Sequence, residues 1–139
     1  MTWIDEGIVY SHENYSGVNQ WIELGEKLLT AGWDSTLKIY DPWENSVIKS
    51  ILLDGEAFSV VEDKNTMGYF VGVGDSSTSK SGKIQFFDGN STVSDVINIS
   101  GIPRGLVMDE NNSLIIVNHT GSISRLISDL DQDGVPDLD

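Results

Sequence analysis

Hydrophobic residues recur at every second position in short runs along this chain, and Gly, Asn, Asp, Ser and Pro separate the runs. A period of two predicts half-buried β-strands, whereas an amphipathic helix needs apolar residues three and four positions apart. No stretch keeps the helical spacing long enough to predict a helix. The pattern therefore predicts an all-β fold.

Eleven runs have the length and composition of strands. In chain order they are GVNQWIELG, KLLTAGW, STLKIYD, SVIKSILLD, AFSVVED, MGYFVGVG, GKIQFFD, TVSDVINIS, RGLVMDE, SLIIVNH and GSISRLIS. Taken in order, they fall into sets of four, and the last set has three members. The Asp-Gly pair at Asp88 and the DPWEN segment that starts at Asp41 are turn signals. Both lie between the third and fourth runs of a set, which supports this division.

The third run of each set makes a repeat visible. It reads TLKIYD at 36–41, KIQFFD at 83–88 and SISRLI at 122–127. The apolar positions that correspond are Leu37, Ile84 and Ile123, followed by Tyr40, Phe87 and Leu126. Their spacing of roughly 39 to 47 residues is typical of propeller blades.

Two segments resemble known blade families. LLTAGWDSTLKIYD resembles the core of a WD-repeat blade, with Trp33-Asp34 at the tight turn and Tyr40-Asp41 in place of the terminal Trp-Asp. GIPRGLVMDENNSLIIVNHTGSISRL resembles a blade of the YVTN or NHL type, although no blade has the Gly-His pair of strict WD repeats. The resemblance covers about residues 14–127 and implies β-propeller-like, four-stranded antiparallel blades, so we assign residues 1–127 to a partial propeller.

The number of blades leaves the ring open. At about 40 to 45 residues per blade the chain holds about three blades, whereas closed propellers usually have four to eight. Blades at the two ends would then expose apolar faces that repeat architectures normally bury against a neighbour. Two explanations stay open: the chain is a piece of a longer protein with further blades, or copies of it associate to complete a ring.

The final segment, SDLDQDGVPDLD, places aspartates at alternate positions. A calcium loop takes side-chain oxygens from its first, third and fifth positions, a carbonyl from its seventh and a further oxygen from its ninth, with Gly at the sixth. These ligand positions fall on Asp129, Asp131, Asp133, Val135 and Asp137. The spacing therefore predicts a Ca²⁺ site in residues 128–139.

This segment also resembles thrombospondin type 3 repeats, which follow the pattern D-x-D-x-D-G-x-x-D with a later Asp. Gly134 occupies the glycine position, but the last acid of the loop would come after Asp139. Loss of that ligand predicts weak binding or partial ordering, and an acidic solvated tail is the alternative. The resemblance implies an extracellular or cell-surface protein, and we expect its export signal to lie outside this chain.

Charge and composition exclude several function classes. The chain has 22 acidic and 8 basic residues and a formal net charge of -14, which opposes binding to nucleic acid and to anionic membranes. It has no cysteine, which excludes disulfides and thiolate metal sites. No run of about 18 apolar residues occurs, so we expect no membrane insertion.

Few side chains offer chemistry. Asp34 follows Trp33 and is expected to bond within its blade, while His119 aligns with Trp33 and is expected at a turn or inner strand. His12 has no partner at useful spacing. Among the tryptophans we expect inter-blade packing, with Trp43 alone on the surface. Five N-x-Ser/Thr sequons, at Asn14, Asn90, Asn98, Asn111 and Asn118, would matter only in a secretory route.

These observations favour a non-enzymatic binding or scaffold module with a protein or glycan ligand and a C-terminal calcium loop. One alternative is part of a propeller enzyme, either a hydrolase or a quinoprotein-like dehydrogenase. Such sites draw residues from several blades, and no nucleophile–base pair occurs in this chain. A second alternative is a self-assembling filament or shell subunit. The interpretation as a binding or scaffold module predicts no catalytic residue in this chain.

Overall fold

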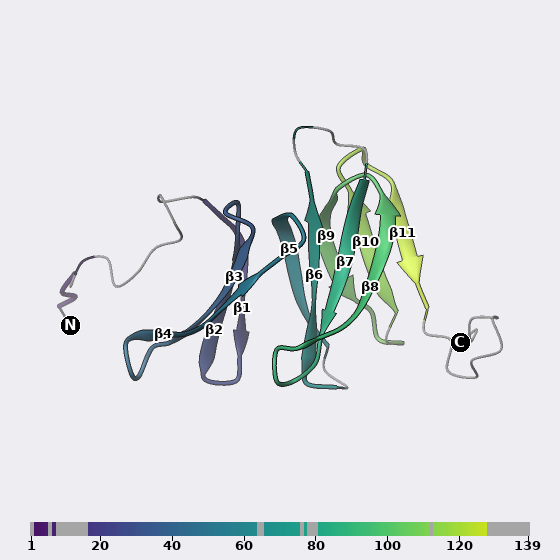
Figure 1. The fold of residues 1–139 in the computed structure, drawn as a ribbon. Coiled ribbons are helices and arrows are strands. Elements are labelled where there is room, and N and C mark those ends of the chain that lie inside the picture. Colours follow the sequence, from purple (N-terminus) through teal and green to yellow (C-terminus); the bar gives the residue numbers. More distant parts are fainter. Residues whose placement is uncertain are drawn as a thin grey trace.

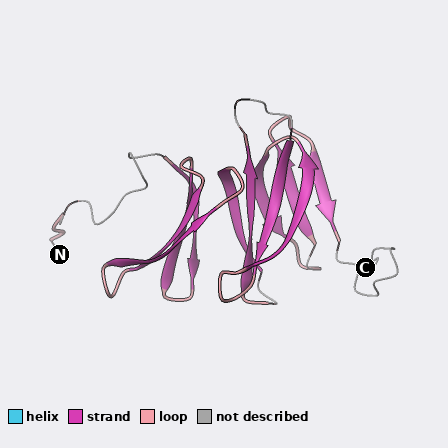
Figure 2. Ribbon diagram, in the orientation of Figure 1, coloured by secondary structure: helices cyan, strands magenta, loops and turns pink. Residues whose placement is uncertain are grey.

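The structure of the protein, a computed structural model, is all-β. It describes residues 2–5, 7, 17–63, 66–75, 77, 81–111 and 113–127. These residues form three antiparallel sheets and no helix (Figures 1 and 2), which confirms the predicted fold class. Consequently, no helix in this part of the chain has the length and hydropathy of a membrane span.

Each sheet corresponds to one predicted set of runs and is called a blade below. Blade 1 has the strand order β1-β2-β3-β4, formed by β1 (Val18–Leu24), β2 (Lys27–Gly32), β3 (Thr36–Asp41) and β4 (Ser46–Leu52). Blade 2 repeats the order with β5 (Glu56–Asp63), β6 (Gly68–Gly74), β7 (Ser81–Phe87) and β8 (Val93–Ser100). Blade 3 has three strands, β9 (Pro103–Met108), β10 (Leu114–Asn118) and β11 (Ile123–Leu126).

Strand register confirms the repeat that the sequence predicts. The partners of Tyr40, Phe87 and Leu126 on the preceding strand are Leu28, Tyr69 and Leu114. The partners of Leu37, Ile84 and Ile123 are Ala31, Gly72 and Val117. The aligned residues therefore occupy the same place in each blade.

The core lies between blades rather than within them. One cluster joins blade 1 to blade 2 and includes Leu29, Leu37, Val60, Val71 and Phe87. A second cluster joins blade 2 to blade 3 and includes Phe70, Ile84, Leu106, Leu114 and Ile116. Blade 2 is buried on both faces because the residues that alternate along β6 serve opposite clusters.

The first strands of the blades lie next to one another, and β5 contacts both β1 and β9. Three side chains bridge them. Asn19 Nδ2 donates to Ala57 O at 2.7 Å, Val60 N donates to Gln20 Oε1 at 2.9 Å, and Ser59 Oγ donates to Pro103 O at 2.7 Å. Because β5 and β9 are the end strands of their sheets, these bonds give hydrogen-bond partners to backbone groups at sheet edges. The bridges fix the spacing of the blades.

The tryptophan prediction is partly wrong. Trp43 is 80% exposed in the β3–β4 turn, as expected. Trp33 packs edge-on against Phe58, with ring centroids 4.9 Å apart. However, Trp21 is 59% exposed and Trp3 is 87% exposed. Trp21 lies on the face of blade 1 that points away from blade 2, and among the described residues no further blade covers that face.

Candidate functional site

Turns and links from the three blades meet at one end of the array, at the upper end in Figure 1. We call this end the loop face. It comprises the β2–β3 turn (33–35), the β4–β5 link (53–55), the end of β6 with Asp75, the β8–β9 link (101–102) and the β10–β11 turn (119–122). The loop face therefore brings together segments that are far apart in sequence.

Each first strand has a bulge at this end. The ladders between first and second strands skip one residue per blade, namely Asn19, Phe58 and Arg104. Bulges redirect a side chain and increase local twist. The bulge therefore changes the direction of the side chain at the same position in all three blades.

The bulged Phe58 of blade 2 contacts both the Trp33 ring of blade 1 and the bulged Arg104 of blade 3. Phe58 is 4% exposed, and the guanidinium carbon of Arg104 lies 5.5 Å from its ring centroid. Trp33 contacts the same ring edge-on. Because Arg104 is exposed, its charge stays in water while an aromatic surface holds the side chain in place. The cluster anchors blades 1, 2 and 3 to one another at the loop face.

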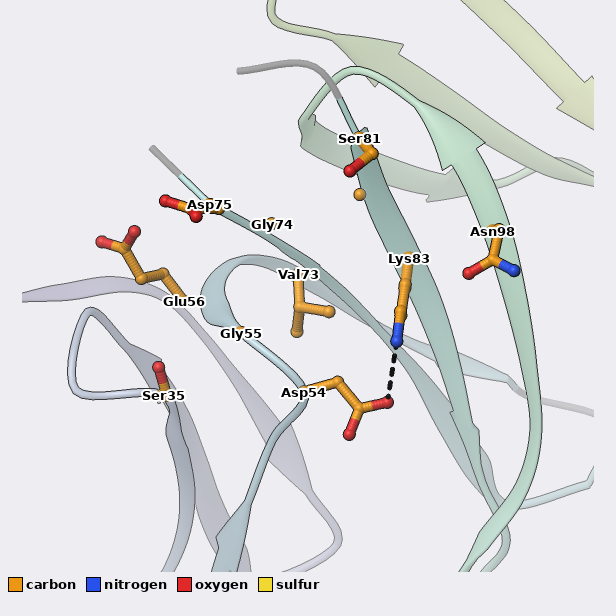
Figure 3. A pocket seen from close by; sticks show the side chains of 11 residues that line it. Ser35, Asp54, Gly55, Glu56, Val73, Gly74, Asp75, Ser81, Lys83 and Asn98 are labelled. Atoms are coloured by element: carbon orange, nitrogen blue, oxygen red, sulfur yellow. Dashed lines mark ion pairs between the residues drawn. The ribbon is translucent and has the colours of Figure 1, made fainter. Parts of the chain in front are cut away.

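A pocket of about 640 Å³ opens on the loop face between blades 1 and 2 (Figure 3). Its polar lining residues come from both blades and are Ser35, Asp54, Glu56, Asp75, Ser81, Lys83 and Asn98. Gly55, Val73, Gly74 and Gly82 supply the rest of the lining. It is the candidate functional site.

Backbone contacts hold the pocket in shape. Leu53 N donates to Ser35 O at 2.8 Å, which ties the β4–β5 link to the β2–β3 turn. Asp54 N donates to the buried Gln85 Oε1 at 3.0 Å, which ties the same link to β7. Both contacts join segments distant in sequence, so the pocket forms only once blades 1 and 2 have packed together.

The pocket lining carries three carboxylates and one ammonium group. Asp54 Oδ2 lies 3.6 Å from Lys83 Nζ, and both side chains are nearly half exposed. Glu56 and Asp75 lie together at another part of the rim (Figure 3), because Glu56 is the register partner of Gly74. Hydrogen bonds from the Ser77 hydroxyl and backbone N–H lower the pKa of Asp75, so it is ionised at neutral pH. The lining is therefore negative.

The residues that might suggest catalysis have structural roles. Asp34 Oδ1 accepts hydrogen bonds from Thr36 N at 3.1 Å and Thr36 Oγ1 at 2.6 Å, which confirms its expected role within the blade. His119 is bound at a turn, as expected: its Nδ1 accepts from Ile102 N at 3.1 Å, and its N–H donates to Ile102 O at 2.9 Å. Trp33 N makes the equivalent bond to Gly17 O, which supports the alignment of the two residues. His12 lies outside the described residues.

The predicted calcium ligands, Asp129, Asp131, Asp133, Val135 and Asp137, also lie outside the described residues. Within the part of the chain that the structure does describe, no three His, Asp or Glu side chains come close enough to hold a metal ion. The Ca²⁺ site stays a prediction from the sequence.

Sequence reasoning missed the pocket. Asp54 and Glu56 lie in an Asp-Gly-Glu link, and Asp75 follows the glycine-rich strand β6. In the sequence, both segments look like ordinary connections between strands. The signal that could have found them is their equivalent position at the same end of neighbouring blades, but only packing shows that they share one cavity.

Comparison with solved structures shows where this fold recurs. The chain is similar to BBS1N in a crystal structure of its complex with ARL6DN, soaked with lead, with a TM-score of 0.62 and 13% sequence identity. The match covers 79% of this chain and 36% of the BBS1N chain, and the complex soaked with mercury gives the same values. The chain thus spans little more than a third of that neighbour's length. No family model and no curated protein matches it.

The neighbours are β-propeller domains, and the three open antiparallel sheets correspond to part of one. At 13% identity this likeness concerns the fold alone. It confirms a partial β-propeller.

Proposed function

We propose that this chain is a non-enzymatic protein-binding module that uses its loop face. The observation that carries the proposal is the pocket between blades 1 and 2, whose rim bears Asp54, Glu56 and Asp75. A propeller neighbour crystallised with a protein partner supports the same class of function. A fragment of a propeller hydrolase or quinoprotein-like dehydrogenase is the alternative. A filament or shell subunit is another.

The chemistry of the pocket favours a basic segment of the partner. The lining holds three carboxylates and a single ammonium group, and the whole chain carries a net charge of -14. Such a field attracts cationic ligands and speeds their association. The glycines in the lining leave room for an extended Lys or Arg side chain to reach the carboxylates. The partner's contact segment is therefore rich in lysine or arginine.

Titration with labelled peptides of equal length, one lysine-rich and one glutamate-rich, tests this proposal. We expect the lysine-rich peptide to bind and its affinity to fall with added salt. Glu56→Gln combined with Asp75→Asn should weaken binding by about three- to tenfold, since each exposed charge contact is worth about 0.2–1 kcal/mol. Fluorescence anisotropy measures both effects.

The control is Glu44→Gln combined with Glu110→Gln, which removes the same charge from exposed turns at the other end of the blades. It should leave peptide affinity nearly unchanged. Equal weakening by both double variants would mean that only net charge matters. Binding of the glutamate-rich peptide, or of neither peptide, would show that the proposal is wrong.

We further propose that residues 128–139 form a calcium loop of low affinity and that the protein acts outside the cell or on its surface. The support is the alternation of Asp129, Asp131, Asp133 and Asp137 with a glycine at the turn position. Bound Ca²⁺ would neutralise aspartates that repel one another and so stiffen the segment. The resemblance to thrombospondin type 3 repeats supports the location.

Terbium luminescence and calorimetric calcium titration test the loop. We expect a dissociation constant on the order of 10⁻⁴–10⁻³ M, in the range of extracellular modules. Asp131→Ala should abolish the signal because it removes a ligand, whereas Gln132→Ala should not, since that side chain points away from the ion in the predicted loop. The calcium loop is ruled out if no binding occurs up to roughly ten millimolar, or if the two variants behave alike.

A further inference from the structure

Blade 3 exposes an apolar face on the side away from blade 2. By register, Ile115 pairs with Val107 and Val117 pairs with Ile123, so the four side chains share one side of the sheet. Val107, Val117 and Ile123 are 53%, 38% and 70% exposed. A continuous apolar patch of this kind on a sheet marks an interaction surface.

The same positions are buried in the other two blades. The residues equivalent to Ile115 and Ile123 are Leu29 and Leu37 in blade 1, and Phe70 and Ile84 in blade 2. Leu29 and Leu37 are fully buried in the cluster that joins blade 1 to blade 2. Ile84 is equally buried against blade 3. The exposed face of blade 3 therefore has the composition and register of a surface that receives another blade.

Blade 1 has the complementary surface at the opposite end of the array. Trp21 and Val47, which are 59% and 37% exposed, lie on the same side of the sheet as Leu28. The position of Trp21 is occupied in blade 2 by Val60, which is 1% exposed and packed against blade 1. One chain thus carries both halves of a blade-to-blade contact.

We propose that a second copy of this chain docks head to tail, with the Trp21 side of its blade 1 on the Val107 and Ile123 side of blade 3. The contact repeats a packing that occurs twice within the chain. Two copies of the three described blades would give six, within the usual range of four to eight for closed propellers. Twofold symmetry then buries both end faces of each copy.

The charges near this contact are compatible with it. Arg125 is the register partner of Ile115 and Lys38 that of Thr30, so each lies on one of the two faces, and Glu23, the partner of Leu28, lies on the Trp21 face. Arg125 Nη2 lies 3.4 Å from Asp109 Oδ2, and Lys38 Nζ donates to Ser50 Oγ at 2.8 Å. The ion pair offsets the charge of Arg125, and Glu23 offsets that of Lys38 on the Trp21 face.

Mass measurement in solution tests the assembly. Light scattering after size exclusion should give twice the chain mass for the unchanged protein and the monomer mass for Ile123→Lys. Met67→Lys is the matched control, since Met67 is 76% exposed in the β5–β6 turn of blade 2, away from both end faces, and it should stay dimeric. Circular dichroism checks that both variants fold. The proposal is overturned if the unchanged protein is a monomer at every concentration. It is also overturned if the two lysine substitutions have equal effects on the mass.

Cross-linking determines the geometry. The chain has no cysteine, so each single-cysteine variant carries one thiol at a known position. Within the chain β3 contacts β5, which are the strands equivalent to β11 and to β1 of the second copy. A short bis-maleimide should therefore join Ile123→Cys to Trp21→Cys in a mixture of the two variants. Self-linking of Ile123→Cys alone would show face-to-face pairing and overturn the head-to-tail arrangement.

Discussion

Leu37→Ala should destabilise the protein by about 2–5 kcal/mol, the range for removing a large aliphatic side chain from a close-packed core. Leu37 is fully buried in the cluster between blades 1 and 2 and pairs with the equally buried Ala31. Few neighbours can relax into the space because strands enclose it on both sides. Urea unfolding followed by tryptophan fluorescence measures the change.

Leu52→Ala is the control for this variant. It makes the same chemical change on β4, where the side chain is 80% exposed, and should alter stability by less than about 0.5 kcal/mol. The two variants should be compared at one protein concentration. Equal losses would mean that the core does not lie between the blades.

Gly72→Ala should be destabilising by about 1–3 kcal/mol because it overpacks the junction between blades 2 and 3. A Cβ at Gly72 would lie 2.8 Å from Pro103 Cγ and 3.0 Å from Pro103 Cβ, and it would collide with Ser59 Oγ. That hydroxyl also makes the bond to Pro103 O that bridges β5 and β9. The methyl group therefore pushes apart two blades that the hydroxyl holds together. Thermal and urea unfolding both report the loss.

Gly105→Ala supplies the comparison in the neighbouring strand. Its Cβ would meet only Val117, at 3.5 Å from Cβ and 3.7 Å from Cγ2, which are ordinary contacts, and its φ is not positive. We expect no loss, or a gain of up to about 1 kcal/mol from the stiffer unfolded chain. Similar losses for the two alanines would show that crowding at Gly72 is not the cause.

Local patterns predicted the strands well, for identifiable reasons. Period-two alternation and turn residues act within a few positions, so all eleven strands and their grouping could be found from the chain alone. The predicted equivalence of Leu37, Ile84 and Ile123 is also confirmed, because strand register follows the same alternation. The structural roles of Asp34 and His119 as turn residues followed from the repeat.

What the alternation could not predict is which apolar face is covered. Leu37 and Ile123 occupy the same repeat position, yet one is fully buried and the other is 70% exposed. Trp21 has the pattern of a packed residue and faces water. Burial between blades depends on which blade comes next in space, and no residue within a blade encodes that.

The sequence by itself determined the strands, their repeat and the acidic character of the chain, because these depend on residue type and short spacing. Only the tertiary structure decided that Asp54, Glu56 and Asp75 share one pocket and that Arg104 lies over Phe58. Those contacts join segments from different blades. The physical reason is that each blade folds by local pairing, whereas its surfaces acquire neighbours only when the blades pack.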